Sequence, residues 1–178
     1  DQSFGRALNS GDQLQSKMIA PHAPLGRKPL TLTTRQSRRW RRRVVSFDAD
    51  LGIRPTPDRV RETLFNWLGH DLLGARCWDM FAGSGVLGYE AASRGAAHVL
   101  MTDHHAGVVA RLQDVAAALL RSDNRERSVS MPGSDRPPGP EVEFDIRVQD
   151  ALALARTPAG VPFDVVFVDP PFDSTDHQ

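Results

Sequence analysis

The chain has 178 residues, of which 40% are hydrophobic, so it fits one globular domain with a sizeable buried core. It has no run of about 18 apolar residues and no basic-then-apolar signal pattern, which argues against a membrane span and against secretion and favours a cytoplasmic protein. The single cysteine, Cys77, excludes an internal disulfide and cysteine-based metal sites and is expected to be a reduced core thiol. The six histidines lack ligand-like spacing, so we expect no metal.

The net charge of the chain is zero, but its N-terminal third is basic and the rest of the chain is acidic. Residues 1–61 hold 13 Lys and Arg against 5 Asp and Glu, whereas residues 62–178 hold 9 against 17. Residues 1–34 are polar and interrupted by proline, which predicts a disordered segment. Residues 35–56 form a basic arm, in which six arginines surround Trp40. We expect the arm to contact phosphates, principally through Arg41, Arg42 and Arg43, and a solvated charge run is the alternative.

An extended stretch with a short strand is expected at 44–56, followed by a helix. Thr56 is the expected N-cap and Pro57 the first helical residue. Gly69 is expected to end the helix. The apolar face of this helix should be formed by Val60, Leu64, Trp67 and Leu68.

From residue 76 the pattern alternates between strand and helix. Strands are expected at 77–81, 98–102, 143–148 and 163–168. Helices are expected at 86–94 and 106–121, with a loop at 122–140. This alternation predicts an α/β domain over 57–178, with a doubly wound, mostly parallel sheet and right-handed crossovers. The last strand, FDVVFV, is almost continuously apolar, which is typical of the buried centre of a parallel sheet.

A glycine-rich turn follows the strand at 77–81 and opens the next helix. The sequence Gly83-Ser84-Gly85-Val-Leu-Gly88 matches the GxGxxG pattern, and Asp103 ends the next strand. This context predicts a nucleoside-cofactor site, in which glycines let the backbone approach the ligand and Asp103 accepts both ribose hydroxyls. A tight turn without a ligand is the alternative.

Acidic residues at the expected strand ends favour S-adenosylmethionine over NAD. Asp79 stands four residues before Gly83, and Asp169 ends the strand at 163–168. Carboxylates there would repel a pyrophosphate and attract a sulfonium and an ammonium, each pair being worth about 4 kcal/mol at 4 Å and a dielectric constant near 20. Asp150, with Ala151 beside it, is placed to accept a hydrogen bond from the adenine amino group, and a helix N-cap is the alternative for Asp150.

The corner Asp169-Pro170-Pro171-Phe172 suits chemistry on an exocyclic amino group. The lone pair of such a nitrogen is delocalised into the base, so two acceptors aimed at its N–H bonds would help to free it. Asp169 and the Pro170 carbonyl can supply those acceptors, and Phe172 can stack on the base. Catalysis would then rest on positioning and electrostatics. Two prolines also simply end a strand, which is the bland interpretation.

The three stretches LGIRPTPDRVRETLFNWL, WDMFAGSGVLGYEAASRGA and FDVVFVDPPF closely resemble the small-subunit rRNA guanine-N2 methyltransferases of the RsmD type. The resemblance covers about residues 40–172. It implies a Rossmann-like class I S-adenosylmethionine-dependent methyltransferase fold. It also implies a cytoplasmic bacterial enzyme, a monomer, that methylates one guanine amino group of 16S rRNA within the small ribosomal subunit or an assembly intermediate.

The resemblance also implies roles for individual residues. Arg54, Thr56 and Arg59 match a segment that caps the cofactor and substrate cleft, and Asp169 to Phe172 match the catalytic corner. The matched cofactor contacts are Asp79, Phe81, Ala82, Gly83, Ser84, Gly85, Gly88 and Asp103. The family continues beyond the corner with a further strand, a helix and a hairpin. Residues 1–178 are therefore expected to form a sheet without its C-terminal strands, prone to aggregation and inactive alone.

Two other functions stay open at this stage. A DNA adenine-N6 or protein-glutamine methyltransferase would use a similar Asp-Pro-Pro-aromatic corner. A non-catalytic RNA-binding relative of the enzyme would keep the basic arm and need not bind the cofactor.

Overall fold

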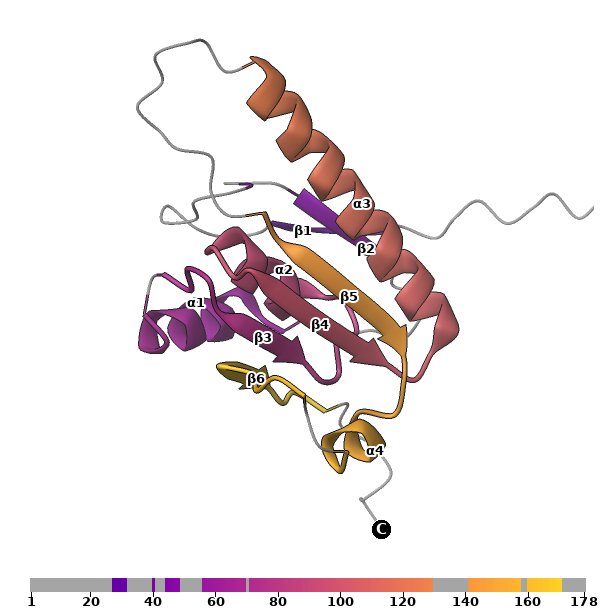
Figure 1. Cartoon of the computed structure of the whole chain (residues 1–178). Helices are drawn as coiled ribbons and strands as arrows, with labels where there is room; N and C mark the ends of the chain where they lie inside the picture. The colour runs from indigo at the N-terminus through magenta and orange to yellow at the C-terminus, as the bar shows by residue number, and fades with distance from the viewer. Residues whose placement is uncertain are drawn as a thin grey trace, which may run out of the picture.

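The computed structural model of the chain describes residues 27–31, 40, 44–48, 56–69, 71–129, 141–157 and 160–170. Its elements in chain order are β1 (Arg27–Thr31), β2 (Val44–Asp48), α1 (Asp58–Trp67), β3 (Arg76–Asp79), α2 (Val86–Ser93), β4 (His98–Asp103), α3 (Ala106–Val129), β5 (Glu143–Val148), α4 (Ala151–Ala155) and β6 (Val165–Phe167) (Figure 1). In the part of the chain described, no helix is long and apolar enough to cross a membrane.

Four of the strands form an all-parallel sheet in the order β5-β4-β3-β6. Cys77 of β3 lies between Val99 of β4 and Val165 of β6, so β3 is the central partner of its neighbours. The chain runs from β3 outward to β4 and β5, and then returns to β6 on the other side of β3. This reversal opens a crevice at the carboxyl ends of the strands, where parallel α/β sheets bind their ligands.

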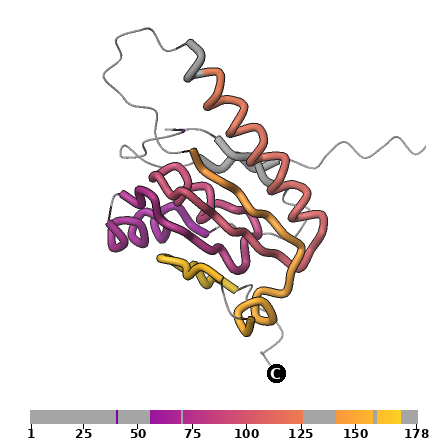
Figure 2. Tube along the Cα trace, in the orientation of Figure 1, coloured from indigo at the N-terminus to yellow at the C-terminus, as the bar shows by residue number. Residues whose placement is uncertain are grey.

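Helices cover both faces of the sheet, as a doubly wound fold requires. One face packs against α2 and α3, and Figure 2 shows the long trace of α3 running beside β5 and β4. Tyr89, Val99, Met101 and Leu112 lie in the core on this face. On the opposite face, Trp78 and Leu100 pack with Ala151 of α4, and the Trp78 ring lies 5.5 Å from that of Phe163. The predicted fold class is confirmed.

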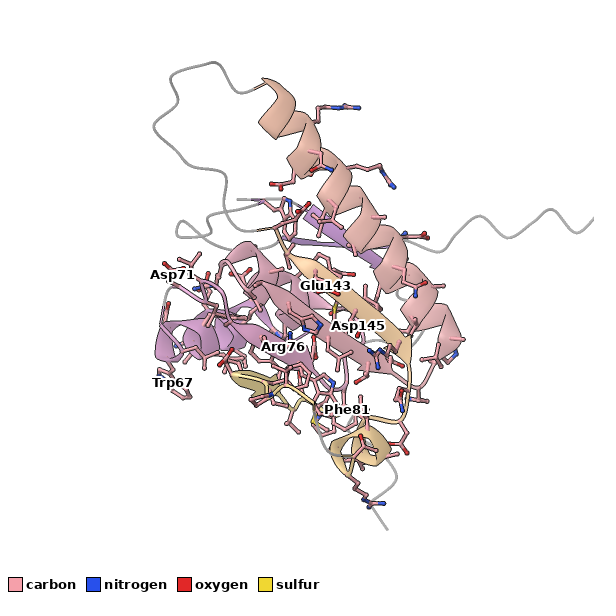
Figure 3. All side chains as sticks on the ribbon, viewed as in Figure 1. Trp67, Asp71, Arg76, Phe81, Glu143 and Asp145 are labelled. Atoms are coloured by element: carbon pink, nitrogen blue, oxygen red, sulfur yellow. The ribbon has the colours of Figure 1, made fainter. Side chains whose placement is uncertain are left out.

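The predicted apolar face of α1 is buried only in part: Leu64 packs against the core, whereas its other members are exposed. The helix buries Arg61 and Phe65, while Val60 is 54% exposed and Trp67 is 82% exposed. Trp67 projects outward from α1 in Figure 3. The Phe65 ring packs at 5.6 Å from that of Phe167, and the guanidinium of Arg94 lies over the Phe65 ring, 4.6 Å from its centroid. The helix is therefore rotated so that an aromatic residue, paired with a buried cation, faces β6 and α2.

Three boundaries differ from the prediction. Helix α3 extends to Val129, so residues 122–129 of the expected loop at 122–140 are helical. Strand β6 has only three residues, and its Val166 is exposed rather than buried because β6 lies at one edge of the described sheet. Strand β1 lies within residues 1–34, which we expected to lack structure, and it pairs antiparallel with β2, the short strand expected within 44–56.

Trp40 does not belong to a solvated arm. Its side chain is buried, and its ring stacks on Phe144 of β5 at 6.1 Å. The arginine-rich composition of residues 35–43 concealed this aromatic anchor, which joins the segment to the core that includes Tyr89.

Candidate active site

Three carboxylates from adjacent strands meet at the carboxyl edge of the sheet. Asp79 ends β3, Asp103 ends β4, and Asp169 lies two residues beyond β6. The pKa of Asp79 is raised partly by the charges of Asp169 and Asp103, so the three groups act on one another. The structure thus brings together the acidic residues that the sequence placed at strand ends.

Asp79 is not the open charge at the mouth of the turn that we expected. Its side chain is buried, and its Oδ2 accepts a hydrogen bond of 3.1 Å from the amide of Gly88 in the first turn of α2. Burial raises the pKa of Asp79 to about 7, against the opposing effect of the Gly88 hydrogen bond. Asp79 therefore accepts from an amide at the N-terminus of α2 that could otherwise donate to a pyrophosphate. Its raised pKa also lets its charge change near neutral pH.

Asp103 is held by two backbone amides. Its Oδ2 accepts from Gly83 at 3.1 Å, and its Oδ1 accepts from His105 at 2.8 Å. A carboxylate offers about four acceptor positions, so capacity for ribose hydroxyls is left on both oxygens. The hydrogen bond to Gly83 also ties the end of β4 to the glycine turn, which fixes the two halves of the predicted nucleoside site against each other.

Packing, as well as ligand approach, explains two of the glycines. Gly85 has a φ of +73°, and a Cβ there would lie 2.4 Å from Leu112 and 2.6 Å from Tyr89. A Cβ at Gly88 would lie 2.7 Å from the sulfur of Met101. The GxGxxG sequence therefore lets α2 lie close to β4 and α3, a role that the sequence did not distinguish from ligand binding.

Gly85→Ala should lower the free energy of unfolding by more than a positive φ alone would cost. The added methyl meets buried side chains, and overpacking of this kind costs about 1–3 kcal/mol beyond the strain of the left-handed backbone. The matched control is Gly74→Ala, because Gly74 has a φ of +78° with nothing within 4 Å of its Cβ position. Urea unfolding of both variants measures the difference, and equal losses would contradict the packing role.

Thr56 lies outside helix α1 rather than capping it. Pro57 occupies the N-cap position with an extended ψ of 143°, and the Thr56 hydroxyl donates a 2.8 Å hydrogen bond to Oδ2 of Asp169. The predicted N-cap role of Thr56 is therefore wrong, because the helix begins at Asp58 and places Pro57, one residue after Thr56, at the N-cap position.

A groove of about 690 Å³ runs between α1 and β6, and its lining is mainly apolar. Thr56 and Asp169 line it, together with Arg59, Trp67 and Val168. The structure thus places two of the expected substrate-binding residues, Thr56 and Arg59, beside the expected catalytic carboxylate.

Asp150 caps helix α4. Its Oδ1 accepts hydrogen bonds from the amides of Leu152 at 2.8 Å and Ala153 at 3.1 Å, so the alternative that we gave for this residue is the observed one. Oδ2 has no part in the cap and is available for a ligand. Ala151 is buried against the sheet and contributes packing.

The other expected site residues divide into three groups. Ala82 and Ser84 are buried in the turn, and Phe81 packs partly against the core on the α4 side, near that helix in Figure 3. Pro170 is exposed at the end of the described segment. The residues that lie outside the described ranges are Arg41, Arg42, Arg43, Arg54, Pro171 and Phe172.

Comparison with known proteins decides the family. The family described as Conserved hypothetical protein 95 matches residues 37–178, which is most of the chain. The chain belongs to this family. Ribosomal RNA small subunit methyltransferase D of Escherichia coli K12 is a relative, 37% identical over 134 residues, and the protein of the same name from Haemophilus influenzae is also 37% identical over 134 residues. The predicted RsmD-type membership is confirmed.

These relatives are longer than the chain. The match covers 75% of this chain but 57% of the Escherichia coli relative and 60% of the Haemophilus one. Among solved structures, the Escherichia coli protein yhhF, provisionally described as a methyltransferase, superposes with a TM-score of 0.59 at 34% identity. That match covers 83% of this chain and 68% of yhhF. The fold is therefore the Rossmann-like methyltransferase fold of this family.

Proposed function

We propose that the protein methylates the exocyclic N2 amino group of a guanine in bacterial 16S rRNA, using S-adenosylmethionine. One observation carries the proposal: two aspartates lie together at the carboxyl edge of the sheet. Asp169 is exposed and accepts a hydrogen bond from Thr56, and Asp79, at the end of β3, is buried against the glycine turn. Family membership supports the assignment, since two relatives are named ribosomal RNA small subunit methyltransferases. The enzyme would act in the cytoplasm as a monomer on the small subunit or an assembly intermediate.

Asp169 is the residue that would orient the substrate nitrogen. It lies two residues beyond β6 and is exposed, so a base can reach it. Oδ2 is engaged by Thr56, which leaves Oδ1 to accept from one N–H of the amino group. The Pro170 carbonyl would accept from the other N–H, and Phe172 would stack on a base that has left its own stack.

The residues at the glycine turn fit an adenosyl cofactor with a positive charge. S-adenosylmethionine would supply the electrophilic methyl group when bound. Asp103 would accept from the ribose hydroxyls, and the free Oδ2 of Asp150 is suited to an amino group. The Gly88 amide is already taken by Asp79, which disfavours a pyrophosphate at this helix.

The test is methyl transfer from labelled S-adenosylmethionine to unmethylated small subunits, naked 16S rRNA and DNA, each followed by digestion to nucleosides. We expect label in N2-methylguanosine from RNA. Label in N6-methyladenine from DNA would establish the DNA alternative. Cofactor-independent RNA binding without transfer would establish the non-catalytic alternative.

The basic arm gives a separate prediction about the RNA partner. RNA affinity should fall with salt by roughly 0.7–0.9 log units per log unit of salt for each phosphate contact, because each contact releases a counterion. Replacing Arg41, Arg42 and Arg43 with alanine should flatten the slope by up to about 2–3 units. The same residues replaced with lysine keep the charge and serve as the control. Equal slopes for the wild type and the alanine variant would place RNA binding elsewhere.

A further inference from the structure

The hydrogen bond between Thr56 and Asp169 joins two parts of the chain that sequence order keeps far apart. Thr56 precedes α1, before the first strand of the parallel sheet, and Asp169 follows the last described strand. Their side chains meet at 2.8 Å, Oγ1 to Oδ2. Thr56 is half-buried, so its hydroxyl is held by its surroundings, whereas Asp169 is exposed.

An exposed aspartate beyond the end of a strand has no packing that selects one rotamer. Asp169 would then sample several staggered positions, only some of which aim an oxygen at a substrate. A hydroxyl donor on a half-buried β-branched residue restricts this freedom, because Thr side chains have few rotamers of their own. Hydrogen bonds to a charged acceptor are also stronger than neutral ones.

The hydrogen bond from Thr56 also gives the two carboxylate oxygens of Asp169 different surroundings. Oδ2 accepts from Thr56, which fixes the direction in which the carboxylate faces and leaves both acceptor positions of Oδ1 open for the substrate. A carboxylate that turned freely would present either oxygen in many directions, and geometric precision of this kind is a large part of catalysis by positioning.

We infer that Thr56 is a positioning residue that fixes the carboxylate of Asp169, so that Oδ1 faces the amino group to be methylated. This inference rests on the proposed function, which gives Asp169 its substrate. It assigns to Thr56, which directly precedes Pro57 and α1, a task in the chemical step.

Thr56→Val removes the hydroxyl and keeps the shape, and Thr56→Ser keeps the hydroxyl. With the full chain and small-subunit RNA, Thr56→Val should lower kcat by about tenfold to a hundredfold and leave KM for RNA and cofactor within about twofold. Thr56→Ser should restore most of the turnover. Thr157→Val is the matched control, since Thr157 is an exposed threonine outside the groove whose hydroxyl donates to the Leu154 carbonyl at 2.6 Å.

Two further measurements separate positioning from a general structural role. In an Asp169→Ala background, Thr56→Val should lower turnover no further, because its effect passes through the missing carboxylate. Three-bond NMR couplings of Asp169 should report one χ1 rotamer in the wild type and in Thr56→Ser, and averaged rotamers in Thr56→Val. The NMR experiment needs no turnover.

The outcomes are distinguishable. Wild-type protein that transfers no methyl group, but shows the single rotamer lost in Thr56→Val, would refute the proposed function and keep the positioning role. A single rotamer in Thr56→Val with unchanged kcat would overturn the inference. An equal loss of turnover with or without Asp169 would overturn it as well.

Discussion

Asp169→Ala should reduce the rate of RNA methylation by about 10²-fold or more, which is the scale of losing one preorganised polar contact. Cofactor affinity should change far less. Asp169 is exposed beyond β6 and is bonded to Thr56, whereas the glycine turn is organised by Asp79 and Asp103. Single-turnover methylation and calorimetric titration with S-adenosylhomocysteine measure the two effects separately.

Asp169→Asn is the matched variant. An asparagine keeps one acceptor oxygen and the shape of the side chain, so it should lose less turnover than the alanine variant. Methylation near the wild-type rate in Asp169→Ala would show that this carboxylate does not orient the substrate nitrogen. A parallel collapse of cofactor affinity would assign it to the cofactor site.

Asp79→Asn should stabilise the protein at pH 8 and remove a pH dependence that we expect for the wild type. Burial raises the pKa of Asp79 from 3.8 to about 7, so between these values the folded state binds more protons than the unfolded state. The free energy of unfolding of the wild type therefore falls as pH rises from about 4 to about 7. Above pH 7 the full penalty persists, on the order of a few kcal/mol at about 1.4 kcal/mol per pKa unit.

Asparagine removes this penalty and can still accept from the Gly88 amide. Thermal melts from pH 5 to pH 8 should show a falling curve for the wild type and a curve for Asp79→Asn that lacks this component. The difference between the two proteins cancels the opposite contribution of His98, whose pKa is lowered mainly by burial. Curves that stay parallel across this range would mean that Asp79 does not titrate near neutral pH.

Stability and cofactor binding should respond to Asp79 in opposite directions. At pH 8 the ionised carboxylate favours a cationic ligand, so Asp79→Asn should bind S-adenosylmethionine about tenfold more weakly, the equivalent of about 1.4 kcal/mol. The loss should shrink at pH 5.5, where the wild type is also neutral. S-adenosylhomocysteine lacks the sulfonium charge and is the control ligand, for which the loss should be smaller.

The sequence by itself determined the order of the parallel strands and helices and the position of the glycine turn. These are local properties: apolar runs such as FDVVFV, glycines such as Gly85 in the turn, and polar residues at strand ends. The carboxyl ends of parallel strands share one edge of a sheet, so Asp79, Asp103 and Asp169 could be expected together before the structure was known.

The tertiary structure alone decided how those residues are used. Thr56 precedes a helix and is of a residue type typical of an N-cap, but in the structure its hydroxyl donates a hydrogen bond to a carboxylate 113 residues away. From the sequence alone Asp79 is expected to be charged. In the folded chain, neighbours from other elements bury its side chain, and this burial raises its pKa to about 7. Trp40 stands among arginines and yet packs on Phe144. In each case the partner is distant in sequence, and the choice among competing partners is made by burial and hydrogen-bond strength in the folded chain.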